Sequence, residues 1–212
     1  MSTDNDSPAE ISGLAALTAA DHETMARLHR RLEQSADRAG ILDVAYTTVD
    51  TPVGTLLLAA TERGLVRVAY QSEGHDQVLD GLGRKLSPRV LRAPRRLDAA
   101  SFEIDEYFRR VRTRFELPLD LSLSAGFRQA VQRYLPSIGY GTTQSYKQVA
   151  EQVGSPRAVR AVGTACSTNP LPIVVPCHRV LRADGTLGGY IGGLTVKSAL
   201  LDLEAPAPAA RA

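Results

Sequence analysis

Residues 169–180 read NPLPIVVPCHRV, and the rest of the chain is organised around this stretch. The apolar run from Ile173 to Val175 is stopped by Pro176, whose ring fixes φ and removes a backbone donor. An apolar run bounded by prolines is typical of a buried segment. We therefore expect Cys177 at the inner end of that segment, on the floor of a pocket.

Cys177 and His178 are the candidate chemical groups of this stretch. A thiol is a weak nucleophile until its pKa falls or a base takes its proton. Adjacent side chains of an extended segment point in opposite directions, so His178 could act on Cys177 only across a kink or through a water molecule. The alternative is that Cys177 is a small buried core residue, as most free cysteines are. The proline before it, the His-Arg pair after it and the glycines downstream favour a reactive thiol.

Upstream of this stretch, the pattern predicts helices joined by short glycine turns. Apolar residues recur at helical spacing over 125–135, and a second helix is expected over 143–154. Ser155 and Pro156 then predict the start of a third helix, 157–166, as its cap and first residue. Two helices around a glycine turn, the second bearing arginines, are typical of a helix-turn-helix. The alternative is a helical hairpin that binds nothing.

The third helix is slim, because small residues surround Arg160 on it. A slim helix can enter a nucleic-acid groove closely, and Arg160 would then reach into DNA. Small residues equally suit tight helix packing, in which case Arg160 is an ordinary surface arginine. The small residues are Ala158, Ala161, Gly163 and Ala165.

Downstream of the central stretch the chain is rich in glycine. Residues 185–193 hold five glycines and one aromatic ring, Tyr190. Such a loop can lie against a flat ligand, since glycine has no side chain. A last helix is expected over 194–204, and residues 205–212 are expected to be a disordered tail. The side chains predicted to face inward on that helix are Leu194, Leu200 and Leu201.

The region before residue 119 predicts a small sheet with helices. The β-rich runs, separated by turn signals, predict a meander of antiparallel strands at 44–49, 55–61 and 65–70. Helices are expected at 76–85 and 97–111. No cluster of residues in this region looks chemical, so we assign it a structural role.

These elements predict the following organisation. Residues 1–40 form an extension that is helical, over 19–39, or loosely held. A structural domain spans 41–118, and Pro118 with Asp120 marks the linker after it. A domain for DNA binding and chemistry spans 119–204.

Composition limits the class of protein. The chain has 212 residues, 43% hydrophobic and 23% charged, which is ordinary for a globular protein. No apolar run reaches the roughly 20 residues that span a bilayer, and the polar N-terminus predicts no signal peptide. Two cysteines without a CxxC pair argue against a disulfide framework and a structural zinc site, so we expect no metal and a reducing cytoplasm.

The net charge of +2 hides an asymmetry along the chain. Residues 120–212 hold nine basic and five acidic residues, a net charge of +4. Between 141 and 182 there are five basic residues and only one acid, Glu151. A local basic surface points to nucleic acid, although solvated basic faces are common.

Together these motifs resemble the O6-alkylguanine-DNA alkyltransferases, also called methylated-DNA–protein-cysteine methyltransferases. The resemblance covers about 41–204. It implies an α/β (α+β) protein with a ribonuclease H-like N-terminal domain and a mainly helical, winged-helix-like C-terminal domain. The matching segments are PVGTL (52–56), YG (140–141), SY (145–146), RAVG (160–163), NP (169–170), PCHRV (176–180), GY (189–190), GGL (192–194), Lys197 and Glu204.

The resemblance implies roles in catalysis. Cys177 would attack the alkyl carbon as a thiolate, and His178 would take its proton through a water molecule. Glu204 would orient and stabilise His178, and Tyr146 would help turn the nucleotide out and offer a proton to the guanine. The alkyl group would stay on Cys177 as a thioether, so each molecule would act once, without cofactor or metal.

The resemblance also implies roles in binding. Double-stranded DNA would be bound through the minor groove, with the alkylated guanine flipped out and Arg160 taking its place in the stack. Asn169 would brace the turn before the active-site run, and the Val175 carbonyl would accept from the exocyclic amine of guanine. The remaining DNA-binding residues would be Ala161, Gly163, Thr143 and Ser145, and the remaining pocket residues Tyr190, Ile191 and Lys197. We expect a monomer with no membrane partner.

Three residues depart from the family pattern. Ile191 stands where some members have a small hydroxyl residue, Gln132 where tryptophan is usual, and Gly139 where proline is usual. Two other functions are alternatives. A non-catalytic sensor of alkylated DNA would lack the nucleophilic cysteine, whereas Cys177 is present. A cysteine hydrolase would leave the helix-turn-helix without a use.

Overall fold

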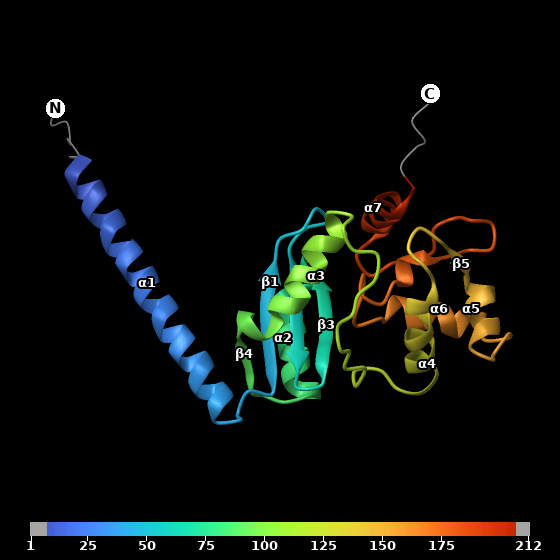
Figure 1. The fold of residues 1–212 in the computed structure, drawn as a ribbon, viewed down its shortest axis with the longest axis horizontal. Coiled ribbons are helices and arrows are strands. Elements are labelled where there is room, and N and C mark those ends of the chain that lie inside the picture. The colour runs from blue at the N-terminus through green and yellow to red at the C-terminus, as the bar shows by residue number, and fades with distance from the viewer. Residues whose placement is uncertain (1–7, 207–212) are drawn as a thin grey trace, which may run out of the picture. The chain divides into compact units, whose positions relative to one another are not determined.

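The structure is a computed structural model that describes the backbone of residues 8–206 and the side chains of residue 21 and residues 23–206. Internal contacts divide the chain into two units, 1–42 and 43–212. Among its described residues, the first unit contains one helix, α1 (Pro8–Arg38), which is longer than the helix expected over 19–39 (Figure 1). Its side chains Met25, Leu28 and Leu32 are exposed. The predicted disorder of the tail falls mostly on 207–212, outside the described residues.

The second unit begins with a four-stranded sheet. Its strands are β1 (Val44–Val49), β2 (Leu56–Thr61), β3 (Gly64–Tyr70) and β4 (Val90–Arg92). The strand order is β3-β2-β1-β4, and the first three strands form the predicted antiparallel meander. Strand β4 pairs parallel to β1 and was not predicted. It has only three residues, half-buried or exposed, which is too short to show an alternating pattern.

Helices cover both faces of the sheet, as Figure 1 shows. Helix α2 (His75–Lys85) packs its Leu82 against a buried cluster that includes Val44, Leu57 and Val66. The opposite face is covered by η2 (Pro94–Leu97) and α3 (Asp98–Phe108). A short 3₁₀ turn, η1 (Gln71–Glu73), joins β3 to α2. Both α2 and α3 lie within one or a few residues of the predicted helices.

The free edge of β3 ties the sheet to the rest of the unit. Leu65 N donates to Pro118 O at 2.8 Å, and Asp120 N donates to Leu65 O at 2.9 Å. Further along, Val68 N donates to Pro170 O at 2.8 Å. The edge that would otherwise be unpaired therefore receives both the linker and the start of the NPLPIVVPCHRV stretch.

The helical half, residues 122–206, packs around its own core. It contains α4 (Gly126–Tyr134), η3 (Leu135–Ser137), β5 (Gln144–Ser145), α5 (Tyr146–Gln152), α6 (Val159–Ser167), η4 (Cys177–Arg179), β6 (Val180–Leu181) and α7 (Leu194–Glu204). Buried apolar side chains from α4, α5 and α6 meet in this core: Val131, Val149, Ala150, Val162 and Ala165. The two-stranded parallel pairing of β5 with β6 brings 144–145 beside 180–181.

The predicted start of the third helix was wrong. Helix α6 begins at Val159, and Ser155 belongs to the end of α5, where its N–H donates to Ala150 O at 2.8 Å. Gly154 at φ +72 makes the left-handed turn that ends α5. Ser155 therefore closes one helix and does not cap the next. Helix α5 likewise begins at Tyr146, with Ser145 as its cap, and not at 143.

Helix α7 has the predicted bounds but presents a different face. Its buried residues are Lys197, Leu200 and Glu204, whereas Leu194 is 52% exposed. Two of the three inward residues are thus ionisable, which no apolar pattern would indicate. Among the described residues, no helix has both the length and the apolar character needed to cross a membrane.

The close approach at the β3 edge gives a prediction about stability. Gly64 has φ +130, and a Cβ there would lie 2.1 Å from Pro118 O. We expect Gly64→Ala to lower the free energy of unfolding by roughly 2–4 kcal/mol, because strain and clash add. The matched control is Gly83→Ala in α2, where a Cβ meets open space; it should raise stability by roughly 0.5–1 kcal/mol. Urea unfolding measures both, and equal midpoints for the two variants would contradict this reading of the edge.

Candidate active site

The NPLPIVVPCHRV stretch is buried as predicted, but its backbone turns and is not extended throughout. Every residue from Leu171 to Val180 is buried. Val175 N donates to Leu171 O at 2.8 Å, which closes a turn, and Ile173 lies at φ +74 inside it. A β-branched residue rarely adopts that conformation, so the surrounding packing must hold it there. The turn delivers Cys177 as the first residue of η4, 1% exposed.

Asn169 holds both the turn and the thiol. Its Oδ1 accepts from Leu171 N at 3.0 Å, and its Nδ2 donates to Val175 O at 2.8 Å. The same amide nitrogen lies 3.2 Å from Cys177 Sγ and donates to it. The side chain therefore hydrogen-bonds to both sides of the turn and also contacts the candidate nucleophile, which the sequence did not indicate.

The Val175 carbonyl, predicted to accept from the exocyclic amine of guanine, is engaged within the protein. This oxygen accepts from Asn169 Nδ2 and also from Cys177 N at 2.8 Å. Two donors occupy the two lone pairs of a carbonyl oxygen. The oxygen is thus committed to the turn, and we do not retain it as an acceptor for guanine.

Behind Cys177, a buried network centres on Glu204. Its Oε1 lies 2.8 Å from His178 Nε2, and Arg179 donates to both carboxylate oxygens at 2.8 and 2.9 Å. Tyr107 Oη donates to Oε1 at 2.7 Å, and Gly141 N donates to Oε2 at 3.2 Å. A carboxylate can only accept, so His178 Nε2 carries its hydrogen and Nδ1 is the bare nitrogen. Nδ1 is buried and has no partner among the described residues.

Burial and charge set the protonation states of this network. Burial raises the pKa of the Cys177 thiol to about 11, against the hydrogen bond from Asn169 and the charge of Lys197. Burial also lowers the pKa of His178, against the hydrogen bond and charge of Glu204. Burial alone would raise the pKa of Glu204, but hydrogen bonds from His178 and Arg179 lower it to about 2. At neutral pH the site therefore holds a thiol, a neutral imidazole and a carboxylate.

Lys197 joins the two segments that border the site. It is fully buried, and its Nζ donates to Val180 O at 2.7 Å and to Gly188 O at 3.4 Å. The ammonium group thus connects the residue after PCHR to the glycine-rich loop. Its positive charge also favours the thiolate form of Cys177.

The glycine-rich loop carries two tyrosine contacts. Tyr190 Oη lies 2.8 Å from Tyr70 Oη of β3, and a Cβ at Gly192 would lie 2.7 Å from the Tyr70 ring. Tyr146, at the start of α5, lies over Gly188, where a Cβ would lie 2.2 Å from its hydroxyl oxygen. Burial raises the pKa of Tyr146 to about 12, which keeps its hydroxyl protonated. Ile191 is half-buried beside Tyr190.

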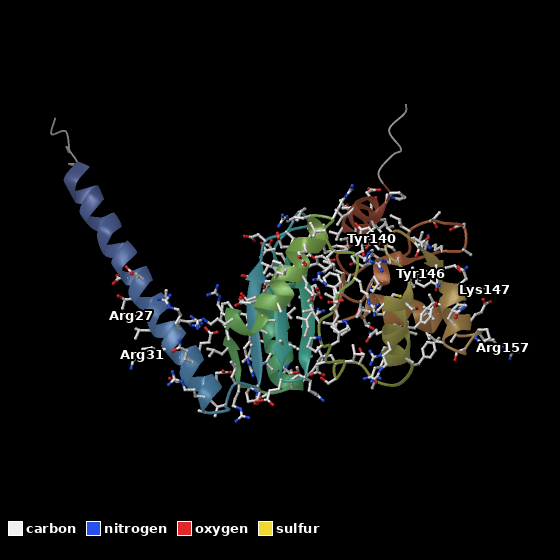
Figure 2. The ribbon with its side chains drawn as sticks, in the orientation of Figure 1. Arg27, Arg31, Tyr140, Tyr146, Lys147 and Arg157 are labelled. Carbon is white, nitrogen blue, oxygen red and sulfur yellow. The ribbon has the colours of Figure 1, made fainter. Side chains whose placement is uncertain are left out.

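The predicted DNA-binding residues lie on α5, α6 and the turn before them. Arg160 and Ala161 are exposed on α6, and a Cβ at Gly163 would meet open space. Thr143 is exposed, but the Ser145 hydroxyl is engaged in capping α5, with Gln148 as its partner. Further exposed basic side chains lie near these helices in Figure 2: Lys147 and Arg157.

The structure brings together one group of predicted residues and separates another. Direct contacts join Cys177 to Asn169 and His178 to Glu204. Arg160, Ala161 and Gly163 share none of these contacts and form a distinct surface. Of the departures, Gln132 lies on α4 and is 1% exposed, and its Nε2 donates to Ala165 O of α6 at 3.4 Å. Its Oε1 has no partner among the described residues, so the substitution affects packing.

Three residues that contact the site were not predicted as site residues. Arg179 and Tyr107 belong to the Glu204 network, and Tyr70 contacts Tyr190 of the glycine-rich loop. The signal for Arg179 was available, because a buried carboxylate needs a buried cation. No local pattern points to the two tyrosines, since their partners lie 120 and 97 residues away.

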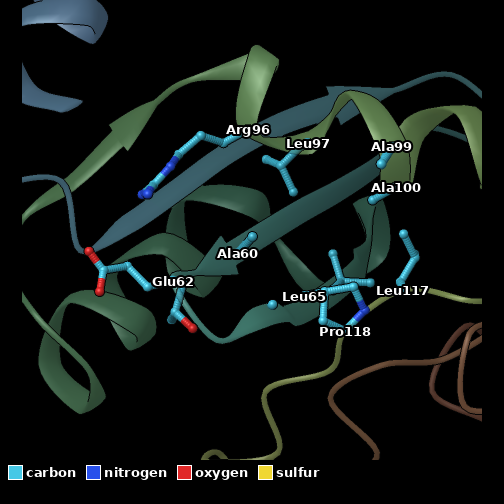
Figure 3. Close-up of a pocket in the computed structure, with 11 residues that line it drawn as sticks. Ala60, Glu62, Leu65, Arg96, Leu97, Ala99, Ala100, Leu117 and Pro118 are labelled. Atoms are coloured by element: carbon cyan, nitrogen blue, oxygen red, sulfur yellow. The ribbon is translucent and has the colours of Figure 1, made fainter. Parts of the chain in front are cut away.

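One cavity lies apart from this site. It has a volume of about 240 Å³. Leu65, Leu97 and Pro118 are among the residues that line it (Figure 3). None of the predicted site residues lines it. The pocket expected above Cys177 stays a prediction.

Comparison with known proteins identifies the family. Residues 44–121 match "6-O-methylguanine DNA methyltransferase, ribonuclease-like domain", and residues 126–206 match the DNA-binding domain of the same family. A methylated-DNA–protein-cysteine methyltransferase of Mycolicibacterium paratuberculosis is 41% identical over 161 residues, which cover 76% of this chain and 92% of the relative. The constitutive enzyme of Bacillus subtilis is 39% identical, covering 75% and 94%.

Solved structures agree with these sequence matches. The crystal structure of Mycobacterium tuberculosis O6-methylguanine methyltransferase superposes with a TM-score of 0.68 at 38% identity, covering 78% of this chain and 96% of that one. A structure of the M. tuberculosis protein in complex with DNA gives 0.65 at 38% identity, covering 77% and 96%. The chain therefore belongs to the 6-O-methylguanine DNA methyltransferase family, and the family matches leave α1 outside.

The depressed pKa of Glu204 predicts how stability depends on pH. The carboxylate contributes stability above its unfolded pKa of about 4.5, and this contribution is lost as pH falls toward 2. The shift corresponds to roughly 3 kcal/mol. We expect the free energy of unfolding to fall over this range in the wild type. In Glu204→Gln that dependence should be smaller, on a lower baseline, since Arg179 is left unpaired. Equal acid dependence in urea titrations of both proteins would refute the assignment.

Proposed function

We propose that this protein repairs alkylated DNA by moving the alkyl group from O6-alkylguanine in duplex DNA onto Cys177, once per molecule. The observation that carries the proposal is the buried Cys177 thiol, held by Asn169 and followed by a His178–Glu204 pair. Membership of the methyltransferase family supports it, and so does the DNA complex of the M. tuberculosis relative.

Binding would use the exposed faces of α5 and α6. Small residues at Ala161 and Gly163 allow the backbone of α6 to come close to the minor groove, and Thr143 extends this surface. The Arg160 side chain is exposed at the start of α6 and would fill the stack when the damaged guanine leaves it. Ser145 would contribute by capping α5, because its hydroxyl is engaged with Gln148 and not directed at DNA. In this reading the alkylated base is turned out toward Tyr146 and Tyr190.

The chemistry would exchange one proton for one alkyl group. The thiol proton of Cys177 passes to His178 Nδ1 through a water molecule, and Glu204 stabilises the imidazolium that results. The thiolate attacks the alkyl carbon, so an S–C bond forms while the C–O6 bond breaks. The electron pair stays on guanine, which takes a proton from Tyr146. Water reprotonates Tyr146, and His178 releases to water the proton that it took from Cys177, so the net change moves one proton from Cys177 to guanine. Tyr146, kept protonated by burial, supplies the hydrogen bond that stabilises the departing base.

The product would be a thioether, which offers no easy route back to a thiol. Each molecule would therefore act once, as a monomer, with no cofactor or metal in the transfer. Tyr190, Ile191 and Lys197 would border the base pocket, and O4-alkylthymine is a second substrate in this proposal.

The proposed transfer predicts a mass change at one cysteine. Mixing the protein with an oligonucleotide duplex containing one O6-methylguanine should add about one methylene, mapped to the Cys177 peptide and stopping at one equivalent. Cys177→Ser should abolish the gain. The matched control is Cys166→Ser, since Cys166 is also a buried free cysteine but does not belong to the Pro-Cys-His run. Tight binding to the lesion without a mass gain would instead indicate a non-catalytic sensor.

The proposed role of Arg160 gives a prediction that separates base flipping from the transfer chemistry. Arg160→Ala should slow transfer from duplex DNA by roughly 10- to 100-fold, because the flipped state loses the side chain that replaces the base. Transfer from a free O6-alkylguanine base should be nearly unchanged. Arg157→Ala serves as the control, since Arg157 is also exposed but lies before α6. Equal losses on duplex and free base would exclude the proposed role of Arg160.

A further inference from the structure

We propose that Tyr107, from the sheet half of the molecule, is a positioning residue for alkyl transfer. Its hydroxyl would hold Glu204 in the orientation in which that carboxylate receives His178 Nε2. The inference rests on the proposed function, since it assigns a role within the same proton path. It gives the sheet half a part in the reaction, where the sequence indicated only structural work.

The contact is short, buried and shared. Tyr107 is fully buried on α3, and its Oη donates to Glu204 Oε1 at 2.7 Å. The same oxygen lies 2.8 Å from His178 Nε2. Tyr107 and His178 therefore compete for the electron density of one carboxylate oxygen. Any change in the tyrosine hydroxyl must change how strongly that oxygen binds the histidine.

The tyrosine ring is fixed independently of its hydroxyl. Aromatic rings surround it, with centroid distances of 5.3, 5.4 and 6.2 Å to Phe108, Phe115 and Tyr140. Burial, together with the charge of Glu204, raises the pKa of Tyr107 far above its usual range. The hydroxyl therefore stays protonated and remains a donor at every pH at which the protein is folded.

The electrostatic consequence has a definite sign. Without the Tyr107 hydroxyl, Glu204 Oε1 has one donor fewer and attracts the imidazolium form of His178 more strongly. His178 would then keep its proton to a higher pH, and a protonated imidazole cannot accept from the thiol. The acid limb of the transfer rate should move to higher pH. The other charged or titratable groups facing His178 and Glu204 stay in place when Tyr107 is replaced: Cys177, Arg179, Tyr190, Lys197 and Tyr140.

The test compares two tyrosines that lie against the same network. Tyr107→Phe removes the donor to Glu204 and keeps the ring. Tyr140→Phe is the matched control, because the Tyr140 hydroxyl donates to Leu203 O at 3.1 Å and not to the carboxylate. Single-turnover transfer from an O6-methylguanine duplex is followed by intact mass between pH 5 and 9. We expect Tyr107→Phe to shift the acid limb upward and to lower the plateau rate roughly tenfold, while Tyr140→Phe keeps the wild-type limb.

A second variant tests the direction in which the acid limb shifts, and it does not require the protein to fold with phenylalanine at position 107. Replacing Tyr107 by 3-fluorotyrosine keeps the size of the ring nearly unchanged and makes the hydroxyl a stronger donor. The acid limb should then move to lower pH, opposite to Tyr107→Phe. Unchanged limbs in both variants, even with reduced rates, would overturn the positioning role and leave Tyr107 as a packing residue. Absence of transfer by the wild type would instead overturn the proposed function itself.

Discussion

The Glu204 carboxylate is the interaction on which this site depends. An ionised carboxylate that is only 2% exposed is unfavourable unless cations and donors surround it. Arg179 supplies the charge and two hydrogen bonds, and His178, Tyr107 and Gly141 supply the rest. These donors come from η4, from α3 and from the turn after α4. One buried charge therefore fixes the relative positions of segments far apart in sequence.

The turn at Gly141 shows how closely this network is built. Gly141 has φ +70, and a Cβ there would lie 2.8 Å from the backbone oxygen of Glu204. Only glycine permits this backbone to come close enough for its N–H to reach the carboxylate. The β3 edge also attaches to the reactive stretch. Val68 N donates to Pro170 O, and Arg67 donates to the same oxygen at 3.2 Å. The sheet half thus holds the start of the reactive stretch directly, and Tyr107 connects it to His178 and Arg179 through Glu204.

Local patterns predicted the elements, and non-local contacts explain what was missed. Strand β1 and helix α7 have the expected bounds, because each carries its own periodicity and end signals. The Pro-Cys-His run indicated the candidate nucleophile, since the residues that suggest it are contiguous in sequence. The start of α6 was misplaced because Ser155 fits two helix-end rules, and the structure uses the one for α5. Domain boundaries and residue roles stay predictions.

The resting state of the site bears on a protein proposed to act once. With the pKa of Cys177 near 11 and His178 neutral, little thiolate is present at neutral pH, so stray alkylating agents would react slowly. In the proposed mechanism, burial of the thiol would thus protect a group that is not regenerated. The same burial makes transfer depend on a proton path, because the thiolate must be formed inside the site. Selectivity and reactivity then have one physical origin: a thiol kept protonated until a substrate is positioned beside a base that can take its proton.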